Sequence, residues 1–369
     1  MDLDAFVNED SARAETPPTP ELASASPPPL SEIDTSQRSL LQNPVLQAIV
    51  CTMGYLGHVW VLSRRSLHLP GGLPSMGWDT IVGLLVLAAA AKRRLSNGRP
   101  AVPPWLTDGR MRTAADKEPE EALMADFGSA DACTGKERVQ LLITCAGLLV
   151  APLLFSFTRP VVDVLLSLIV LAGAPLNSVR MASARLILEQ TLLYVVLGKV
   201  VAARHPQFWT KRWVRWNWRG PWLMPVLGGY AASLALFNLI EPINQMLLPG
   251  LAYLPEGIVA KLANPADRNV GSLILASVAP CIGAPLFEEL QSRAFILQAL
   301  TALLPLRNAL LVQGLLFGAQ HLQLGLVLPL SVTGFIWGVL YVNSGNLLVP
   351  VLIHALWNAR IFLGSYLGL

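Results

Sequence analysis

The chain has few charged residues for its length. Asp, Glu, Lys and Arg make up 14% of its 369 residues, whereas a soluble globular protein has about 25%. Hydrophobic residues make up 53%, and the mean hydropathy is +0.50. This composition excludes an ordinary soluble domain and predicts a multi-pass integral membrane protein, with the lipid bilayer as its surroundings.

A large excess of charge of one sign is also missing. The formal net charge is only +3, and the basic residues are spread between apolar segments. Proteins that bind nucleic acid usually concentrate Lys and Arg on one surface. We therefore expect no nucleic-acid partner.

Cysteine is rare, and its spacing carries no motif. The four cysteines include no CxxC pair and no spacing typical of a metal site: Cys51, Cys133, Cys145 and Cys281. Three of them lie in apolar segments, where a reduced, buried thiol is the usual state. The sequence therefore does not favour a function based on cysteine chemistry.

Two segments lack long apolar runs. Residues 1–43 are rich in Pro, Ser, Glu and Asp, a composition that predicts a disordered acidic tail. Transit peptides are rich in Arg and poor in acidic residues, so this tail contains no clean targeting signal. Residues 92–138 form a second polar stretch, which predicts a solvent-exposed loop.

Apolar windows occupy most of the remaining sequence. A bilayer core of about 30 Å requires roughly 20 apolar residues per helix. The sequence predicts an all-α fold, a polytopic bundle of about 8–10 transmembrane helices. We divide it into N-terminal membrane helices at 44–248 and a second set at 270–365. The individual windows are about 45–63, 77–91, 139–158, 161–178, 184–202, 222–248, 270–300, 308–326, 327–343 and 347–367.

Three ionisable residues interrupt the window at 270–300. Placing a charged side chain at the bilayer centre costs about 2.5–3.5 kcal/mol, so such groups normally face a protein interior or a hydrated cavity. Glu289 and Arg293 are four residues apart and can pair on one helix face, whereas Glu288 points about 100° away. A lone Glu/Arg pair most often holds helices together. Alternatively, Arg293 orients one carboxylate while the other accepts a proton from water.

Two histidines occupy the later windows. Phe317 and His321 are four residues apart, as are His354 and Asn358, so each pair shares a helix face. Each pair alone is more typical of a packing contact or an interhelical hydrogen bond. With Glu288, Glu289 and Arg293, however, they form a set that suits the activation of water. Five glycines in the region would allow the helices to approach closely: Gly314, Gly318, Gly325, Gly334 and Gly338.

The order and spacing of these residues resemble the CPBP family. The pattern consists of Glu288-Glu289-x-x-x-Arg293, Phe317-x-x-x-His321 and His354-x-x-x-Asn358, within residues of about 270–365. This family, also called the Abi family, groups CaaX prenyl endopeptidases of the Ras-converting-enzyme type with bacteriocin-processing relatives and plant plastid members.

The resemblance implies catalytic roles for six residues. Glu288 would be the base that activates water, with Glu289 and Arg293 beside it. His321 would help to bind the water, and His354 with Asn358 would stabilise the oxyanion. The resemblance implies hydrolysis without an obligate metal or other cofactor. Zinc remains an alternative, because Glu288, His321 and His354 are residue types that bind it, although no HExxH motif is present.

We therefore predict an intramembrane endopeptidase. Its partner would be a membrane-anchored protein, such as a prenylated CaaX protein or peptide, cleaved by glutamate-activated water. A non-catalytic membrane scaffold or regulator is the main alternative. An ion transporter is less favoured, because the sequence shows no inverted repeat. If the chain is eukaryotic, plastid and endoplasmic reticulum membranes both remain open.

Overall fold

The computed structural model describes residues 43–62, 66–67, 76–107, 134–174, 177–205, 214–249, 262–263 and 269–367. The tail predicted at 1–43 lies outside the described residues except for Asn43. Most of the loop predicted at 92–138 also lies outside them. The described ends of that segment are partly helical, because a helix that begins at Trp78 continues to Ser96 and a short one spans Pro104–Thr107.

The described chain is helical apart from one pair of two-residue strands, β1 and β2, which is antiparallel. The predicted all-α fold is therefore confirmed. The elements are α1 (Pro44–Gly57), η3 (His58–Leu62), β1 (Ser66–Leu67), β2 (Met76–Gly77), α2 (Trp78–Ser96), α3 (Pro104–Thr107), α5 (Gly135–Ser156), α6 (Arg159–Leu171), α7 (Ser178–Arg204), α8 (Leu223–Leu247), α10 (Val270–Val278), η8 (Ala279–Gly283), α11 (Ala284–Glu289), η9 (Leu290–Leu297), α12 (Gln298–Thr301), α13 (Leu306–Gln320), η10 (Leu324–Leu326), α14 (Val327–Ser344) and α15 (Leu348–Leu367).

Six of the described helical segments are long and apolar enough to cross a membrane: Pro44–Val61, Gly135–Leu154, Ser178–Arg204, Leu223–Leu247, Val270–Thr301 and Leu324–Ser344. A shorter apolar helix covers Leu348–Gly364. The windows predicted at 77–91, 161–178 and 308–326 also fold as helices, namely α2, α6 and α13. These three helices are too short or too polar to count among the six. The sequence prediction of about 8–10 membrane helices is therefore larger than the six spans found among the described residues.

Glycines bring α13 and α14 close together, as the sequence predicts. A Cβ atom added at Gly314 would lie 2.8 Å from the carbonyl oxygen of Ser331, and one added at Gly334 would lie 2.8 Å from the Cβ of Phe317. Real Cβ atoms do not approach neighbours so closely, and a larger residue would force the helices apart. This hairpin places the end of α13, and therefore His321, against the polar segment of the long helix.

A buried turn sets the start of α15. Asn217 and Asn346 exchange two hydrogen bonds, from Asn217 N to Asn346 Oδ1 at 2.9 Å and from Asn346 Nδ2 to the Asn217 carbonyl at 2.8 Å. Gly345, the residue before Asn346, has a φ of 55°, in the left-handed region that glycine adopts without strain. The connector that precedes α8 is thereby fixed to the turn between α14 and α15.

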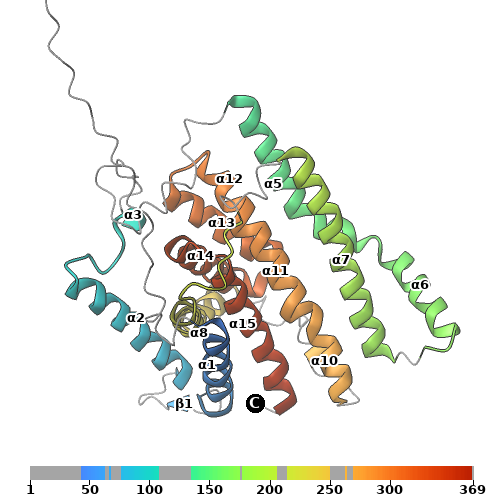
Figure 1. Ribbon diagram of the computed structural model, residues 1–369, viewed down its shortest axis with the longest axis horizontal. Helices are drawn as coiled ribbons and strands as arrows, with labels where there is room; N and C mark the ends of the chain where they lie inside the picture. Colours follow the sequence, from blue (N-terminus) through green and yellow to red (C-terminus); the bar gives the residue numbers. More distant parts are fainter. Residues whose placement is uncertain are drawn as a thin grey trace, which may run out of the picture. The chain divides into compact units, whose positions relative to one another are not determined.

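The long helix of residues 270–301 lies between α7 and α15. Figure 1 shows α10, α11 and α12 in one continuous line, with α15 along one side and α7 along the other, and both neighbours contact it. The helix α8 packs against α2, α14 and α15 and contributes Tyr230 and Leu234 to the core. Glu288 on α11 lies close to His321, which follows α13, and to His354 on α15.

Candidate active site

The helix that carries Glu288 and Glu289 changes its winding on both sides of them. Residues Ala279–Gly283 and Leu290–Leu297 form π-helical turns, and the short α11 lies between them. Proline explains the first change, because Pro280 and Pro285 have no N–H group to donate within the helix. The N–H of Ala284 donates to the carbonyl of Ala279 five residues back. Such π turns are frequent at functional sites.

Side chains of neighbouring helices donate to two carbonyl groups of the first π turn. In an α-helix the Pro280 carbonyl would accept from Ala284, and in a π-helix it would accept from Pro285, which has no N–H. The Nδ2 of Asn358 on α15 donates to the Pro280 carbonyl at 2.7 Å instead. The hydroxyl of Tyr194 on α7 donates to the Gly283 carbonyl at 2.6 Å. Two side chains therefore hold the turn that precedes Glu288.

Glu289 and Arg293 form the ion pair that their spacing predicts. The Nη1 of Arg293 lies 2.8 Å and 2.9 Å from the two carboxylate oxygens, and both side chains are fully buried. Nη2 donates to the Gly334 carbonyl at 2.9 Å, and the guanidinium lies 4.5 Å from the ring centroid of Phe317. A buried charge pair of this kind stabilises a fold only when further polar contacts complete it.

His354 completes this buried pair. Its Nδ1 lies 2.9 Å from Oε1 of Glu289, and its ring packs at 4.6 Å, centroid to centroid, against Trp337. The Trp337 indole donates in turn to Ser233 on α8. The Glu289 carboxylate, paired with Arg293, accepts this hydrogen bond, and the Nδ1 of His354 donates it.

His321 directly follows α13 and is fixed by that helix. Its Nδ1 lies 2.7 Å from the carbonyl of Phe317, one turn earlier. A carbonyl oxygen can only accept, so this nitrogen carries the proton. The ring of Phe317 makes an edge contact with the imidazole, with 4.9 Å between centroids. Leu322, which follows, has the positive φ of 53° that turns the chain away from the helix.

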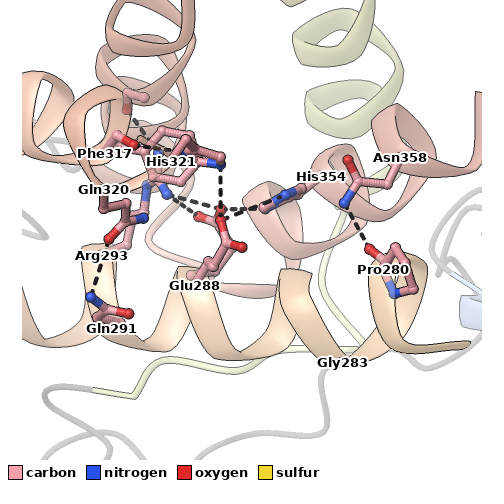
Figure 2. A network of polar contacts seen from close by, with 12 residues as sticks. Pro280, Gly283, Glu288, Gln291, Arg293, Phe317, Gln320, His321, His354 and Asn358 are labelled. Carbon is pink, nitrogen blue, oxygen red and sulfur yellow. Dashed lines mark hydrogen bonds and ion pairs between the residues drawn. The ribbon is translucent and has the colours of Figure 1, made fainter. Parts of the chain in front are cut away.

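Both histidines direct their other nitrogen toward Glu288. The Nε2 of His321 lies 3.6 Å and that of His354 lies 4.0 Å from Oε2 of Glu288 (Figure 2). In the neutral rings these nitrogens are acceptors, because the protons are on Nδ1. Oε2 of Glu288 has no hydrogen-bond partner among the residues that the structure describes. Three acceptor atoms therefore converge on one point.

The cluster has a buried part and a more open part. Glu289 and Arg293 are fully buried and the His354 side chain is 5% exposed, whereas Glu288 is 23% and His321 is 27% exposed. The open part contains Glu288, whose Oε2 has no hydrogen-bond partner among the described residues, and the buried part supports it. This arrangement is suited to a reaction at Glu288 with the other residues holding its surroundings.

Asn358 lies apart from the other five predicted residues. Its amide is turned toward Pro280, on the far side of His354 from His321 (Figure 2). Glu288, Glu289, Arg293, His321 and His354 are joined by contacts of 4.0 Å or less. The structure therefore brings five of the six residues together and links the sixth to the backbone of the same helix.

Glu288, His321 and His354 are also the residues that the sequence offers as zinc ligands. Over the described ranges, no group of three or more His, Cys, Asp and Glu side chains is arranged to hold a metal ion. Hydrolysis without a metal remains a prediction that chelation can test.

Three polar residues near the site were missed by the motif pattern. Gln291 donates through Nε2 to Oε1 of Gln320 at 3.2 Å and to the carbonyl of Leu148 at 3.2 Å. Tyr194 is the third. The signal for the two glutamines was present in the sequence, because both are polar residues in apolar windows: Gln291 lies between Glu289 and Arg293, and Gln320 adjoins His321. Tyr194 has no such signal, because its partner is a backbone carbonyl.

Comparison with known proteins identifies the family of the segment that contains this site. Residues 270–360 match the family model described as Type II CAAX prenyl endopeptidase Rce1-like, and this range contains all six predicted site residues. No match is found to a curated protein or to a solved structure. The resemblance drawn from the motifs is confirmed: in this multi-pass integral membrane protein, residues 270–360 form an Rce1-like domain of the CPBP/CAAX protease family.

Proposed function

We propose that the chain is an intramembrane endopeptidase in which Glu288 activates water to cleave a membrane-anchored protein of the CaaX type. The observation that carries this proposal is the position of Oε2 of Glu288. This atom has no hydrogen-bond partner in the described part of the chain and lies 3.6 Å from Nε2 of His321 and 4.0 Å from Nε2 of His354. A water molecule donates to Glu288 and to His321 in this arrangement. Its oxygen lone pair is then free to attack a carbonyl carbon.

The proposed reaction has two steps. The water oxygen bonds to the carbonyl carbon while one of its protons passes to Glu288, and the carbonyl oxygen becomes negatively charged. The carbon–nitrogen bond then breaks, the carbonyl re-forms, and Glu288 returns its proton to the departing amine nitrogen. The reaction consumes one water for each peptide bond and uses no cofactor.

The other residues support Glu288 in this scheme. Glu289 and Arg293 neutralise each other and hold His354 with its Nε2 toward Glu288. The carbonyl of Phe317 holds His321 in the matching tautomer. Fixed groups of this kind lower the cost of reorganisation during the reaction.

Cleavage of a prenylated CaaX peptide by the purified protein in nanodiscs tests the proposal. Glu288→Gln retains size and removes the base, and we expect its rate to fall by about 10²–10⁴-fold. Glu241→Gln, on α8 and outside the cluster, is the matched control and should cleave at the rate of the unmodified protein. No cleavage by the unmodified protein, together with full biological activity of Glu288→Gln, would instead support the scaffold alternative.

A further inference from the structure

We propose that Trp337 and Ser233 are positioning residues, which together fix the direction of the His354 ring at the reacting centre. This inference rests on the hydrolytic function proposed above. Trp337 lies on α14 and Ser233 on α8. Neither residue belongs to the six predicted from the motifs, and Ser233 lies outside the matched range of residues 270–360.

The His354 ring needs more than one hydrogen bond to hold its direction. Its Nδ1 lies 2.9 Å from Oε1 of Glu289, and its Nε2 lies 4.0 Å from Oε2 of Glu288. A hydrogen bond at Nδ1 restrains one atom of the ring and still allows the ring plane to tilt. Groups that act in catalysis have to be held to within about 0.5 Å and 10–20°. The direction of Nε2 therefore depends on what packs against the ring.

Trp337 provides this packing. The centroids of its ring and of the His354 ring are 4.6 Å apart, at an interplanar angle of 43°. The same indole lies 5.6 Å from the guanidinium carbon of Arg293, within the range of a cation–π contact. Arg293 and His354 both bind the carboxylate of Glu289. One indole therefore contacts both partners of that carboxylate.

Ser233 fixes the rotation of the indole. The Nε1 of Trp337 donates to Oγ of Ser233 at 2.9 Å. The Ser233 hydroxyl donates its own proton to the carbonyl of Gly229 at 2.7 Å, so its oxygen is left to accept from the indole. Ser233 is fully buried, and a hydrogen bond in such surroundings is stronger than one in water. The orientation of Trp337 is therefore set from α8.

Neighbouring rings enclose the indole on other sides. Trp357 on α15 makes an edge contact with Trp337, with 6.3 Å between centroids, and Phe317 makes another at 5.7 Å. Phe317 also meets the edge of the His354 ring at 6.1 Å. In a close-packed interior a ring held in this way does not swing without displacing its neighbours. A fixed indole therefore gives His354 a fixed surface to pack against.

A second tryptophan offers a direct comparison. Trp222 is 2% exposed and Trp337 is 1% exposed. The Trp222 indole also donates a hydrogen bond, to the carbonyl of Trp218 at 3.0 Å. Trp222 directly precedes α8, so it lies about 16 Å from Ser233 along the helix axis. The two tryptophans therefore share burial and a hydrogen bond, but Trp337 is the one that packs on His354.

Steady-state cleavage of the CaaX peptide by the full chain in nanodiscs tests this role. Trp337→Phe retains an aromatic ring and removes the N–H group. We expect kcat to fall about tenfold, because a shift of about 1 Å costs about 100-fold and the retained ring limits the shift. KM should change less than about twofold. Ser233→Ala should cause the same loss. The double variant should be no slower than either single variant, since both changes remove one hydrogen bond.

Trp222→Phe is the matched control. It loses the same kind of buried indole hydrogen bond, so we expect a similar fall in Tm and an unchanged kcat. If kcat falls as far in Trp222→Phe as in Trp337→Phe, the loss reflects general destabilisation and the positioning role is overturned.

A transition-state analogue separates positioning from packing alone. A phosphinate peptide carries a tetrahedral, negatively charged group in place of the scissile carbonyl, and His354 is among the residues predicted to stabilise that charge. Its affinity should fall about tenfold in Trp337→Phe and in Ser233→Ala. The affinity for the uncleaved peptide, measured in a Glu288→Gln background, should not fall. If Trp337→Phe does not fold, Ser233→Ala tests the same hydrogen bond through the loss of a single oxygen.

The two proposals fail in different ways. Unchanged kcat and phosphinate affinity in Ser233→Ala and Trp337→Phe would overturn the positioning role and leave the hydrolase standing. Losses that multiply in the double variant, to about 100-fold, would mean that the two residues act separately and would also overturn it. No cleavage by the unmodified protein would remove both proposals.

Discussion

Glu289 and His354, 65 residues apart, are joined by a hydrogen bond of 2.9 Å inside the protein. Arg293 pairs with the same carboxylate from the next helical turn. The ion pair between Glu289 and Arg293, which are four residues apart, is thereby linked to His354 on α15. The connection makes Glu289 the residue on which both the ion pair and the histidine depend.

Replacing Glu289 should therefore destabilise the protein strongly. We expect Glu289→Gln to lower the free energy of unfolding by about 3–5 kcal/mol, because Arg293 remains buried without its counter-charge. Denaturant unfolding of the purified protein measures this change. Asp163→Asn is the control: it breaks the more exposed Arg185–Asp163 pair, 3.3 Å apart, and should cost less than about 1 kcal/mol. Equal effects of the two variants would contradict the buried pair.

The side chains that hold the π turn should be individually important. Tyr194→Phe removes only the hydroxyl that donates to the Gly283 carbonyl, and we expect the free energy of unfolding to fall by about 0.5–1.5 kcal/mol, the usual net contribution of one hydrogen bond. Cleavage should fall as well, since Glu288 follows this turn directly. Ser277→Ala, which removes an exposed local hydrogen bond on the same long helix, should change neither quantity. A Tyr194→Phe protein that is as stable and active as the parent would refute this role of the hydroxyl.

The close approach of α13 and α14 predicts a sharp effect of one methyl group. Gly334→Ala places a Cβ 2.8 Å from the Cβ of Phe317, and we expect about 1–3 kcal/mol of destabilisation from overpacking. Gly147→Ala on α5 meets no atom within 4 Å and should be neutral or slightly stabilising, since alanine favours helix. Thermal unfolding of the two variants side by side measures the difference, and the same Tm for both would argue against tight packing.

Removal of metal ions should leave cleavage intact. In the proposed reaction Glu288 takes the proton of water directly, so a chelator that strips zinc should not reduce the rate. The measurement is peptide cleavage after dialysis against chelator, with and without added zinc. Activity that is lost on chelation and restored by zinc would mean that His321 and His354 act as metal ligands.

His205 predicts a pH dependence of stability. Its side chain is buried, and its Nε2 lies 2.9 Å from the hydroxyl of Thr144. Burial, and then the charge of Arg204, lower the pKa of His205 below its ordinary value of 6.5. The unfolded chain therefore binds the proton first. This contribution to stability is complete above pH 6.5 and is lost as the pH falls below it toward the lowered pKa.

The expected result is a Tm that falls from pH 7 to pH 5 in the unmodified protein. The slope should be smaller in His205→Gln, which keeps a polar contact with Thr144 and cannot be charged. Parallel curves for the two proteins would assign the pH dependence to other groups.

The sequence predicts the fold class and the local part of the site because both depend on short spacings. Apolar windows gave the helical membrane bundle, and the four-residue spacing of Glu289 and Arg293 gave their ion pair. The windows did not distinguish the helices that meet the length and hydropathy criteria of a membrane span from shorter ones such as α6 and α13. A helix can be apolar because it is buried in the protein or because it faces lipid. Apolar composition alone therefore does not separate the two kinds of helix.

The sequence does not predict contacts that depend on tertiary structure. The partner of His354 is Glu289, and the partner of Asn358 is a carbonyl that a π turn releases; neither follows from residue type. Asp79 and Arg360 illustrate the same limit. They form a 2.9 Å ion pair between α2 and α15 across 281 residues, and no spacing rule connects them.

The π turn before Glu288 also makes the site sensitive to its neighbours. Its Gly283 carbonyl accepts from Tyr194 on α7, and its Pro280 carbonyl accepts from Asn358 on α15. A tilt of either helix, such as one that follows a change in bilayer thickness, would pull on this turn and shift the carboxylate. Lipid chain length should therefore tune the reaction rate even where no lipid touches a reacting atom.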